Sequence, residues 1–297
     1  MSTGVSIGVS TGGSTGGSTG AAGSGIGQPL LSVEPETFDP LAADYDQQFT
    51  HTRIGRMMRE AVWARCAARF APGSRVLEMN CGTGEDALWL AQQGIEVLAT
   101  DVSPAMLQIA QRKLAAADAA MMRVRFSQVC APQFRCLAWE RLHTLEAAGF
   151  DGALSNFGGL NCVADLSRAA PALADKLRPG AVAVLCIMGP LVPWEWLWFV
   201  RRAEWGRAFR RLRGTARWRG IEVHYHSISA TRRAFAPYFR LLRVAAIGAL
   251  LPPPYTEASW VGKEGTLRRL QRLERAAGRC WPLPQLADHY LMELRRR

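Results

Sequence analysis

The most informative segment of the sequence is Val76-Leu77-Glu78-Met79-Asn80-Cys81-Gly82-Thr83-Gly84-Glu85-Asp86. A short apolar run is followed by small residues and then by acidic residues typical of a helix start, which predicts a strand, a tight turn and a helix. Gly82 and Gly84 let the backbone approach a ligand closely, at a helix N-terminus with free N–H groups. The segment therefore predicts a ligand-binding turn.

A second segment adds to this site. Asp101 comes seventeen residues after Gly84, at the end of the next predicted strand. A carboxylate at that place accepts both hydroxyls of a ribose. Ser103 caps the following helix, and Met106 on that helix is placed to pack on an adenine ring. The two segments together predict a cofactor that contains adenosine.

Two classes of cofactor use such an arrangement. Gly82, Gly84 and Ala87 satisfy the Gly-x-Gly-x-x-Gly/Ala pattern of nicotinamide dinucleotide sites. In those sites, however, the glycines directly follow the strand and receive a pyrophosphate. Here Glu78 stands four residues before Gly82, and a carboxylate beside the turn repels pyrophosphate and favours a cationic ligand.

The stretch from Glu78 to Gly84 resembles the first motif of the class I S-adenosylmethionine-dependent methyltransferases, an acidic residue followed by alternating glycines. Asn80 departs from that motif, but asparagine tolerates the left-handed backbone better than most residues. The resemblance continues through five further segments: Tyr45-Asp46, Asp101 to Leu107, Phe150-Asp151, Leu177-Arg178-Pro179-Gly180 and Asp288-His289-Tyr290.

This resemblance implies that S-adenosyl-L-methionine is the cofactor. The positions that match the family's binding residues are Tyr45, Glu78, Asn80, Gly82, Gly84, Asp101, Val102, Met106, Cys130, Asn156 and Phe157. Cys130 stands where many members have an acidic residue that contacts adenine, and a thiol is a poor acceptor for the adenine amino group. Backbone groups or a different residue would then make that contact.

Short apolar runs alternate with longer amphipathic stretches through most of the chain. The predicted strands are 75–79, 96–101, 124–128, 151–155, 181–188, 239–247 and 288–295, and the predicted helices between the first five are 85–93, 105–118, 134–148 and 163–177. Strands that alternate with helices predict a doubly wound, mostly parallel α/β sheet. The alternating last strand is typical of an antiparallel edge. The resemblance implies the seven-stranded Rossmann-like methyltransferase sheet, with a helical lid inserted before its last strands.

Composition divides the chain into four parts. Residues 1–32 are rich in Gly, Ser and Thr and are expected to form a disordered leader; residues 33–189 form the predicted cofactor-binding core, 190–238 an aromatic and Arg-rich insertion, and 239–297 the end of the sheet. No signal peptide or membrane-spanning run is found, so we expect a cytoplasmic protein. Seven cysteines without a Cys-x-x-Cys pair predict neither disulfides nor a metal site.

The net charge of +11 is confined to one part of the chain. Residues 1–189 carry 15 basic and 17 acidic groups, a net −2, whereas residues 190–297 carry 21 basic and 8 acidic groups, a net +13. Residues 190–220 alone hold eight arginines and five tryptophans. Three interpretations stay open: a lid over an apolar or acidic substrate, contact with an anionic membrane surface, or RNA binding. A packed helical pair with a solvated basic face would also explain part of the charge.

The acceptor side of the site is expected where the fourth strand ends, because ligands bind beyond the carboxyl ends of such strands. Asn156 and Phe157 follow that strand, and we expect Asn156 to be part of the site where the methyl group is transferred. Asn161 is expected to cap the next helix. The candidate catalytic residues are Asn156, His224 and His226, with His289 as a further possible base. A solvent-facing histidine pair stays an alternative. Cys162 is expected to be a buried small residue.

These observations predict a methyltransferase that acts on a small, apolar or acidic acceptor. Three alternatives stay open. The first is an RNA methyltransferase that docks through its basic C-terminal third, and the second is an NAD(P)-dependent oxidoreductase. The third is a catalytically silent scaffold, which the departures at Asn80 and Cys130 permit.

Overall fold

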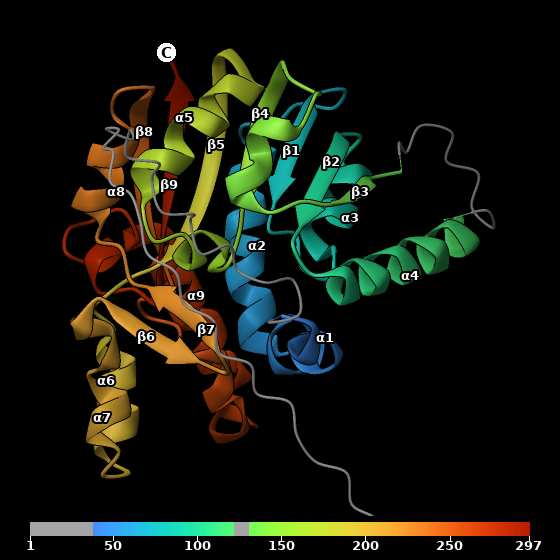
Figure 1. Cartoon of the computed structure of the whole chain (residues 1–297). Coiled ribbons are helices and arrows are strands. Elements are labelled where there is room, and N and C mark those ends of the chain that lie inside the picture. Colours follow the sequence, from blue (N-terminus) through green and yellow to red (C-terminus); the bar gives the residue numbers. More distant parts are fainter. Residues whose placement is uncertain (1–37, 122–130) are drawn as a thin grey trace, which may run out of the picture. The chain divides into compact units, whose positions relative to one another are not determined.

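The apolar runs of the sequence form one mixed sheet of seven strands. The computed structural model describes residues 38–121 and 131–297, with the side chains of 118–121 excepted. The strands of the sheet are β1 Arg75–Met79, β2 Glu96–Asp101, β3 Gln133–Cys136, β4 Phe150–Ser155, β5 Leu177–Met188, β8 Phe239–Ile247 and β9 His289–Arg296. They lie in the order β3-β2-β1-β4-β5-β9-β8 (Figure 1). The first five run parallel, and β9 is antiparallel to both of its neighbours.

Helices connect the strands and cover both faces of the sheet. The α-helices are α1 Asp39–Tyr45, α2 Arg53–Ala67, α3 Glu85–Gln92, α4 Pro104–Met121, α5 Leu166–Lys176, α6 Pro193–Val200, α7 Trp205–Ala208, α8 Ile228–Phe235 and α9 Glu264–Ala277. Short 3₁₀ or π turns are η2 Asp46–Thr50, η3 Trp139–Thr144, η4 Gly159–Cys162, η5 Arg210–Arg213, η6 Pro254–Trp260 and η7 Leu283–Gln285. The doubly wound fold that the sequence predicts is confirmed.

Two apolar clusters hold the layers together, one on each face of the sheet. Leu173 of α5 and Phe235 of α8 are fully buried against one face, together with Phe239 and Tyr290. Met58 of α2 lies in the cluster on the opposite face, which also takes in side chains of α3 and α9. The removal of this apolar surface from water is the main term that favours folding.

The last strand differs from its sequence-based prediction. The prediction of an antiparallel strand is correct, but β9 lies between β5 and β8 and not at an edge. The polar residue that gives the strand its alternating pattern is Glu293, which is fully buried. Burial opposes ionisation of Glu293, but the ion pairs with Arg65 of α2 and with Arg69, just after that helix, hold the pKa of its carboxyl below its usual value. A buried ion pair thus mimics the pattern of an edge strand.

The region around the third strand also differs. The predicted strand at 124–128 lies outside the described residues, and the strand that pairs with β2 is Gln133–Cys136. The predicted helix at 134–148 is wrong, because its first residues form β3 and Trp139–Thr144 form the 3₁₀ turn η3. This shift changes which residues follow the strand, and therefore which residues reach the site.

The insertion before the last strands is only partly helical. It begins with α6, α7 and η5, as the lid prediction implies, and continues as a two-stranded hairpin of β6 Thr215–Trp218 and β7 Ile221–His224. Figure 1 shows these elements on the side of the sheet where the parallel strands end. Among the described residues, no helix is both long enough and apolar enough to cross a membrane.

Candidate functional site

The turn after β1 has the backbone that its sequence demands. Asn80, Gly82 and Gly84 all have a left-handed φ, of 59°, 53° and 76°. A Cβ at Gly84 would lie 2.7 Å from the Cβ of Ala110, whereas a Cβ at Gly82 would meet no atom within 4 Å. Gly84 therefore allows α3 to pack on α4, while Gly82 faces open space at the start of a helix.

Asp101 closes this turn from the neighbouring strand. Its carboxylate accepts the backbone N–H of Gly82 at 2.8 Å and the backbone N–H of Ser103 at 2.9 Å. Burial raises the pKa of Asp101 above its usual value, although these hydrogen bonds oppose the rise. Each oxygen keeps a lone pair, and the residue lines a cavity, so the carboxylate is available to further donors.

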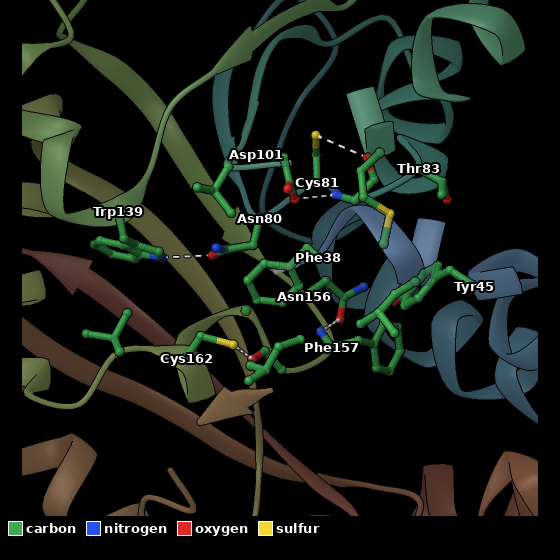
Figure 2. A pocket seen from close by; sticks show the side chains of 18 of the residues that line it. Phe38, Tyr45, Asn80, Cys81, Thr83, Asp101, Trp139, Asn156, Phe157 and Cys162 are labelled. Atoms are coloured by element: carbon green, nitrogen blue, oxygen red, sulfur yellow. Dashed lines mark hydrogen bonds between the residues drawn. The ribbon is translucent and has the colours of Figure 1, made fainter. Parts of the chain in front are cut away.

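The cavity has a volume of about 210 Å³ and brings most of the predicted cofactor residues together. Figure 2 shows Asn80, Asp101, Asn156 and Phe157 converging on it from different strands, with Tyr45 reaching it from the N-terminal helix. The predicted residues in its wall are Tyr45, Asn80, Gly82, Asp101, Val102, Met106, Asn156 and Phe157. Their assignment to cofactor contacts stays a prediction, but their juxtaposition fits it.

Other predicted residues do not line the cavity. Glu78 is buried in β1, and Gly84 serves helix packing, as described above. Cys130 lies outside the described residues. His224 and His226 are also not in the wall: the ring of His226 lies 2.8 Å from the carbonyl oxygen of Val163, and burial lowers its pKa below the usual value. The structure therefore does not bring this histidine pair into the site.

Glu78 is a buried acid with an incomplete set of partners. Its side chain is 1% exposed, and its Oε2 accepts no hydrogen bond among the described residues. Burial and the nearby carboxylate of Asp86 raise the pKa of Glu78 well above its usual value. A cation bound near the turn would favour the ionised form, because an opposite charge offsets the cost of burial.

Sequence reasoning missed a buried ion pair in the wall. Arg59 of α2 pairs with Asp86 of α3, and its guanidinium lies over the rings of Phe49 and Phe157. The Nδ2 of Asn156 donates to Asp86 at 3.0 Å. The signal available in the sequence is an arginine next to Met58 on the apolar face of a predicted helix, followed by an acid in the first turn after the glycines.

Trp139 is a second missed residue. Its indole N–H donates to Oδ1 of Asn80 at 2.8 Å, which Figure 2 shows as the contact between the two side chains. Ser155 donates to the same oxygen at 3.2 Å. Ala138 and Glu140 line the cavity beside Trp139. These residues follow β3, whereas Cys130, the residue predicted to stand beside adenine, lies outside the described residues.

The N-terminal helix is tied to the glycine turn by polar contacts. Asp39 accepts the hydroxyl of Ser103 at 2.5 Å, and Asp46 accepts the hydroxyl of Thr83 at 2.7 Å. Lys113 pairs with Asp46 at 2.9 Å and with Glu85 at 3.0 Å. These contacts hold α1 over the cavity. This placement is compatible with the prediction that Tyr45 contacts the cofactor.

Part of the cavity wall is apolar. Its apolar side chains include Leu41, Val163, Met188, Trp218, Ile221 and Val223. Trp218 and its two neighbours in the hairpin come from the insertion, whereas the tryptophans of α6 do not line the cavity. Cys162 also faces it, and burial raises the pKa of this thiol to about 12, so it stays protonated at neutral pH.

The residues fit a cationic adenosine-type cofactor. Gly82 leaves open space above the turn, and Asp101 offers free acceptor positions beside it. The charged residues in the wall are four acids (Glu85, Asp86, Asp101 and Glu140) and one base (Arg59). This excess of negative charge disfavours the pyrophosphate of a dinucleotide and favours a sulfonium and an ammonium group.

Comparison with known proteins agrees with this fit. Residues 76–180 match a family described as a methyltransferase domain. The chain is 29% identical over 149 residues to the demethylmenaquinone methyltransferase of Clavibacter sepedonicus, which covers 50% of this chain and 55% of that protein. The chain thus spans about half the length of the curated relatives it matches.

The fold has counterparts among solved structures. An S-adenosylmethionine-dependent methyltransferase from Mesorhizobium loti matches with a TM-score of 0.50 and 19% identity, over 80% of this chain and 98% of that one. Magnesium protoporphyrin IX methyltransferase from Synechocystis PCC 6803, solved with bound S-adenosylhomocysteine, matches with a TM-score of 0.52 and 16% identity, over 89% and 97%. Residues 76–180, which match the methyltransferase domain, contain the glycine turn, and the sheet has the fold of these solved S-adenosylmethionine-dependent methyltransferases.

Proposed function

We propose that this protein transfers the methyl group of S-adenosyl-L-methionine to a small, predominantly apolar acceptor. One observation carries the proposal: the wall of a single cavity contains both the glycine turn with Asp101 and a group of apolar side chains. A polar cofactor and an apolar acceptor would therefore meet inside one cavity. Such an arrangement positions the two reactants, which is the main requirement of methyl transfer.

The bound cofactor supplies an electrophilic methyl group on a positively charged sulfur. Asp101 would hold the ribose hydroxyls, and Met106, Ala138 and Trp139 would enclose the adenine. The hydrogen bonds of Asp101 to the backbone of Gly82 and Ser103 fix the carboxylate before any ligand binds. Such pre-organisation lowers the entropic cost of binding.

Asn156 also lines the cavity, and it would act as a residue that positions the acceptor against the cofactor. Its Nδ2 donates to Asp86, and its Oδ1 accepts the N–H of Phe157 at 3.0 Å. The backbone of Phe157 has a left-handed φ of 44°, which costs free energy and is typical of residues at functional sites. The amide of Asn156 does not titrate, so it orients neighbouring groups and does not accept a proton.

The apolar side chains of the cavity wall suggest the chemical class of the acceptor. Trp218, Ile221 and Val223 offer an apolar surface that would stabilise a ring compound by burial and stacking. The relatives named for demethylmenaquinone support this class, because they act on a lipid-soluble ring compound by that name. We propose a lipid-soluble aromatic or quinol-type acceptor. The alternatives of an RNA acceptor and of a nicotinamide-dependent oxidation have no comparable support in the cavity wall.

The proposal can be tested with methyl-labelled cofactor. The full chain is incubated with the cofactor and, in parallel, with a reduced naphthoquinone, a phenolic acid, a short amine and total RNA. We expect label in the organic phase with the naphthoquinol and none with RNA, and we expect Asp101→Ala to abolish it. Label in RNA alone, or label in none of the four, would contradict the proposed acceptor class.

A further inference from the structure

The first part of the insertion carries an exposed surface that the catalytic proposal does not use. We define this basic–apolar surface as the exposed side chains of residues 197–213, which extend from the second half of α6 through α7 to η5. Its apolar members are Leu197, Trp205, Phe209 and Leu212, with exposed fractions of 45%, 59%, 39% and 51%. Single exposed apolar residues are common, but four within seventeen positions mark an interaction site.

Arginines surround these apolar side chains. Arg201, Arg202 and Arg213 are exposed and make no ion pair within the described parts of the chain. The nearby acids do not offset them: Glu195 of α6 is buried between Arg210 and Arg211, and Glu204 pairs with Arg207 at 2.5 Å. The surface is therefore strongly positive as well as apolar.

The segment is anchored to the sheet and is not a loose loop. Arg211 is buried and pairs with Glu195 at 2.8 Å and with Asp288 at 2.6 Å, next to β9. It also donates to the backbone carbonyl of Gly189 at 3.2 Å. The ring of Trp196 packs near that of Phe209, with centroids 6.1 Å apart. The exposed side chains are thus held on a fixed support, which lowers the entropic cost of docking.

We propose that the basic–apolar surface docks onto an anionic lipid membrane. Arginine is attracted to acidic lipid headgroups, while tryptophan, phenylalanine and leucine insert at the boundary of the acyl chains. RNA would engage the arginines and the aromatic rings, but it would gain nothing from the exposed leucines. The combination of charge with aliphatic side chains therefore favours a lipid surface over a nucleic acid.

The basic–apolar surface lies next to the hairpin that lines the cavity, so docking would bring the cavity close to the membrane. This step rests on the proposed acceptor class. The chain passes from η5 directly into β6, where Trp218 is 46% exposed and also lines the cavity. Figure 1 shows α6 and α7 beside the β6–β7 hairpin. A lipid-soluble acceptor would leave the membrane next to the hairpin whose apolar side chains line the cavity.

Vesicle flotation of the full chain tests the docking. Vesicles of phosphatidylcholine alone are compared with vesicles that contain 30% phosphatidylglycerol, at low and high salt. We expect binding only to the anionic vesicles, weakened by salt, and weakened about ten-fold or more by Arg201→Glu/Arg202→Glu. The matched control is Arg232→Glu/Arg233→Glu, which makes the same charge change on exposed residues of α8. Equal loss in the control would overturn the proposal.

A second pair of variants separates the apolar contribution from charge. Leu212→Ser should reduce vesicle binding several-fold, whereas Leu273→Ser on α9, a leucine of similar exposure at 57%, should not. Binding of S-adenosylhomocysteine without vesicles should be unchanged in all these variants, so failure of docking is distinguished from failure of the cofactor site. Absence of binding to anionic vesicles would overturn the membrane assignment. So would an Arg201→Glu/Arg202→Glu variant that loses binding to RNA but keeps its binding to vesicles.

Discussion

The side chain of Asn80 occupies the space that a side chain at residue 159 would need. A Cβ added to Gly159 would lie 2.3 Å from both the Cβ and the Cγ of Asn80. Trp139 and Ser155 donate to the amide oxygen of Asn80 and hold it in this place. The departure from the family's glycine at position 80 is thus matched by a glycine in the turn after β4, and the two turns fit together as one unit.

This relationship predicts a rescue. Gly159→Ala should destabilise the protein by about 1–3 kcal/mol, because it forces an extra carbon against a held side chain. Asn80→Gly in the same chain removes the opposing atoms and should recover most of that loss. Urea unfolding of the two single variants and the double variant measures the coupling. Additive losses in the double variant would show that the two residues do not compete for space.

The buried ion pair of Arg59 and Asp86 predicts an asymmetric cost. Asp86→Ala leaves the guanidinium buried without its counter-charge and should lower the free energy of unfolding by about 3–5 kcal/mol. Arg59→Met combined with Asp86→Leu removes both charges and should cost clearly less. The control is Glu96→Ala, which breaks the exposed pair with Arg75 and should cost at most about 1 kcal/mol. Equal losses of stability in Asp86→Ala and Glu96→Ala would refute this prediction.

Arg211 is predicted to hold the insertion in place. Burial opposes the ionisation of Asp288, but the charge of Arg211 holds the pKa of this carboxyl well below its usual range, so the pair persists as pH falls to about 4. Arg211→Met leaves Glu195 and Asp288 without their main partner. We expect faster hydrogen exchange across α6, α7 and β6, with exchange in β1 and β2 unchanged. Uniform acceleration throughout the sheet would indicate global destabilisation and would refute a local anchoring role.

The two buried acids near the glycine turn predict proton release on binding. The pKa values of Glu78 and Asp101 are both raised in the free protein, mainly by burial. A cationic cofactor favours their ionised forms, so binding should expel protons, and affinity should increase as pH rises through the raised pKa values. Calorimetry at mildly acidic pH in two buffers of different ionisation enthalpy measures this release. Glu78→Gln should reduce it, and proton uptake in the unchanged protein would reverse the assigned sign.

The sequence predicts the part of the site that depends on local backbone. Residues such as Gly82 and Asp101 sit at strand ends, where apolar runs and turn residues mark the boundaries clearly, and the left-handed backbone at Asn80 follows from its residue type. Trp139 could not be placed in the same way. Trp139, Leu142 and Leu145 are spaced by three and all buried, and this spacing in a 3₁₀ turn resembles the period of an amphipathic helix.

Contacts between distant segments account for the other differences. Arg59 is a typical surface residue of a helix until Asp86, 27 positions later, is folded against it. Glu293 gives β9 the pattern of an exposed edge, because nothing in the strand itself reveals its partners Arg65 and Arg69. His224 and His226 are candidate bases from the sequence alone, but neither lines the cavity. In each of these examples, contacts with segments far away in the sequence determine where the side chain lies.

Calorimetry of the full chain with S-adenosylhomocysteine and with NADH measures which cofactor the protein binds. We expect micromolar binding of S-adenosylhomocysteine, no binding of NADH, and loss of binding in Asp101→Ala but not in the matched control Asp175→Ala, an exposed acid of α5. Absence of S-adenosylhomocysteine binding to the folded protein, or unchanged affinity in Asp101→Ala, would refute the assignment of this cofactor site.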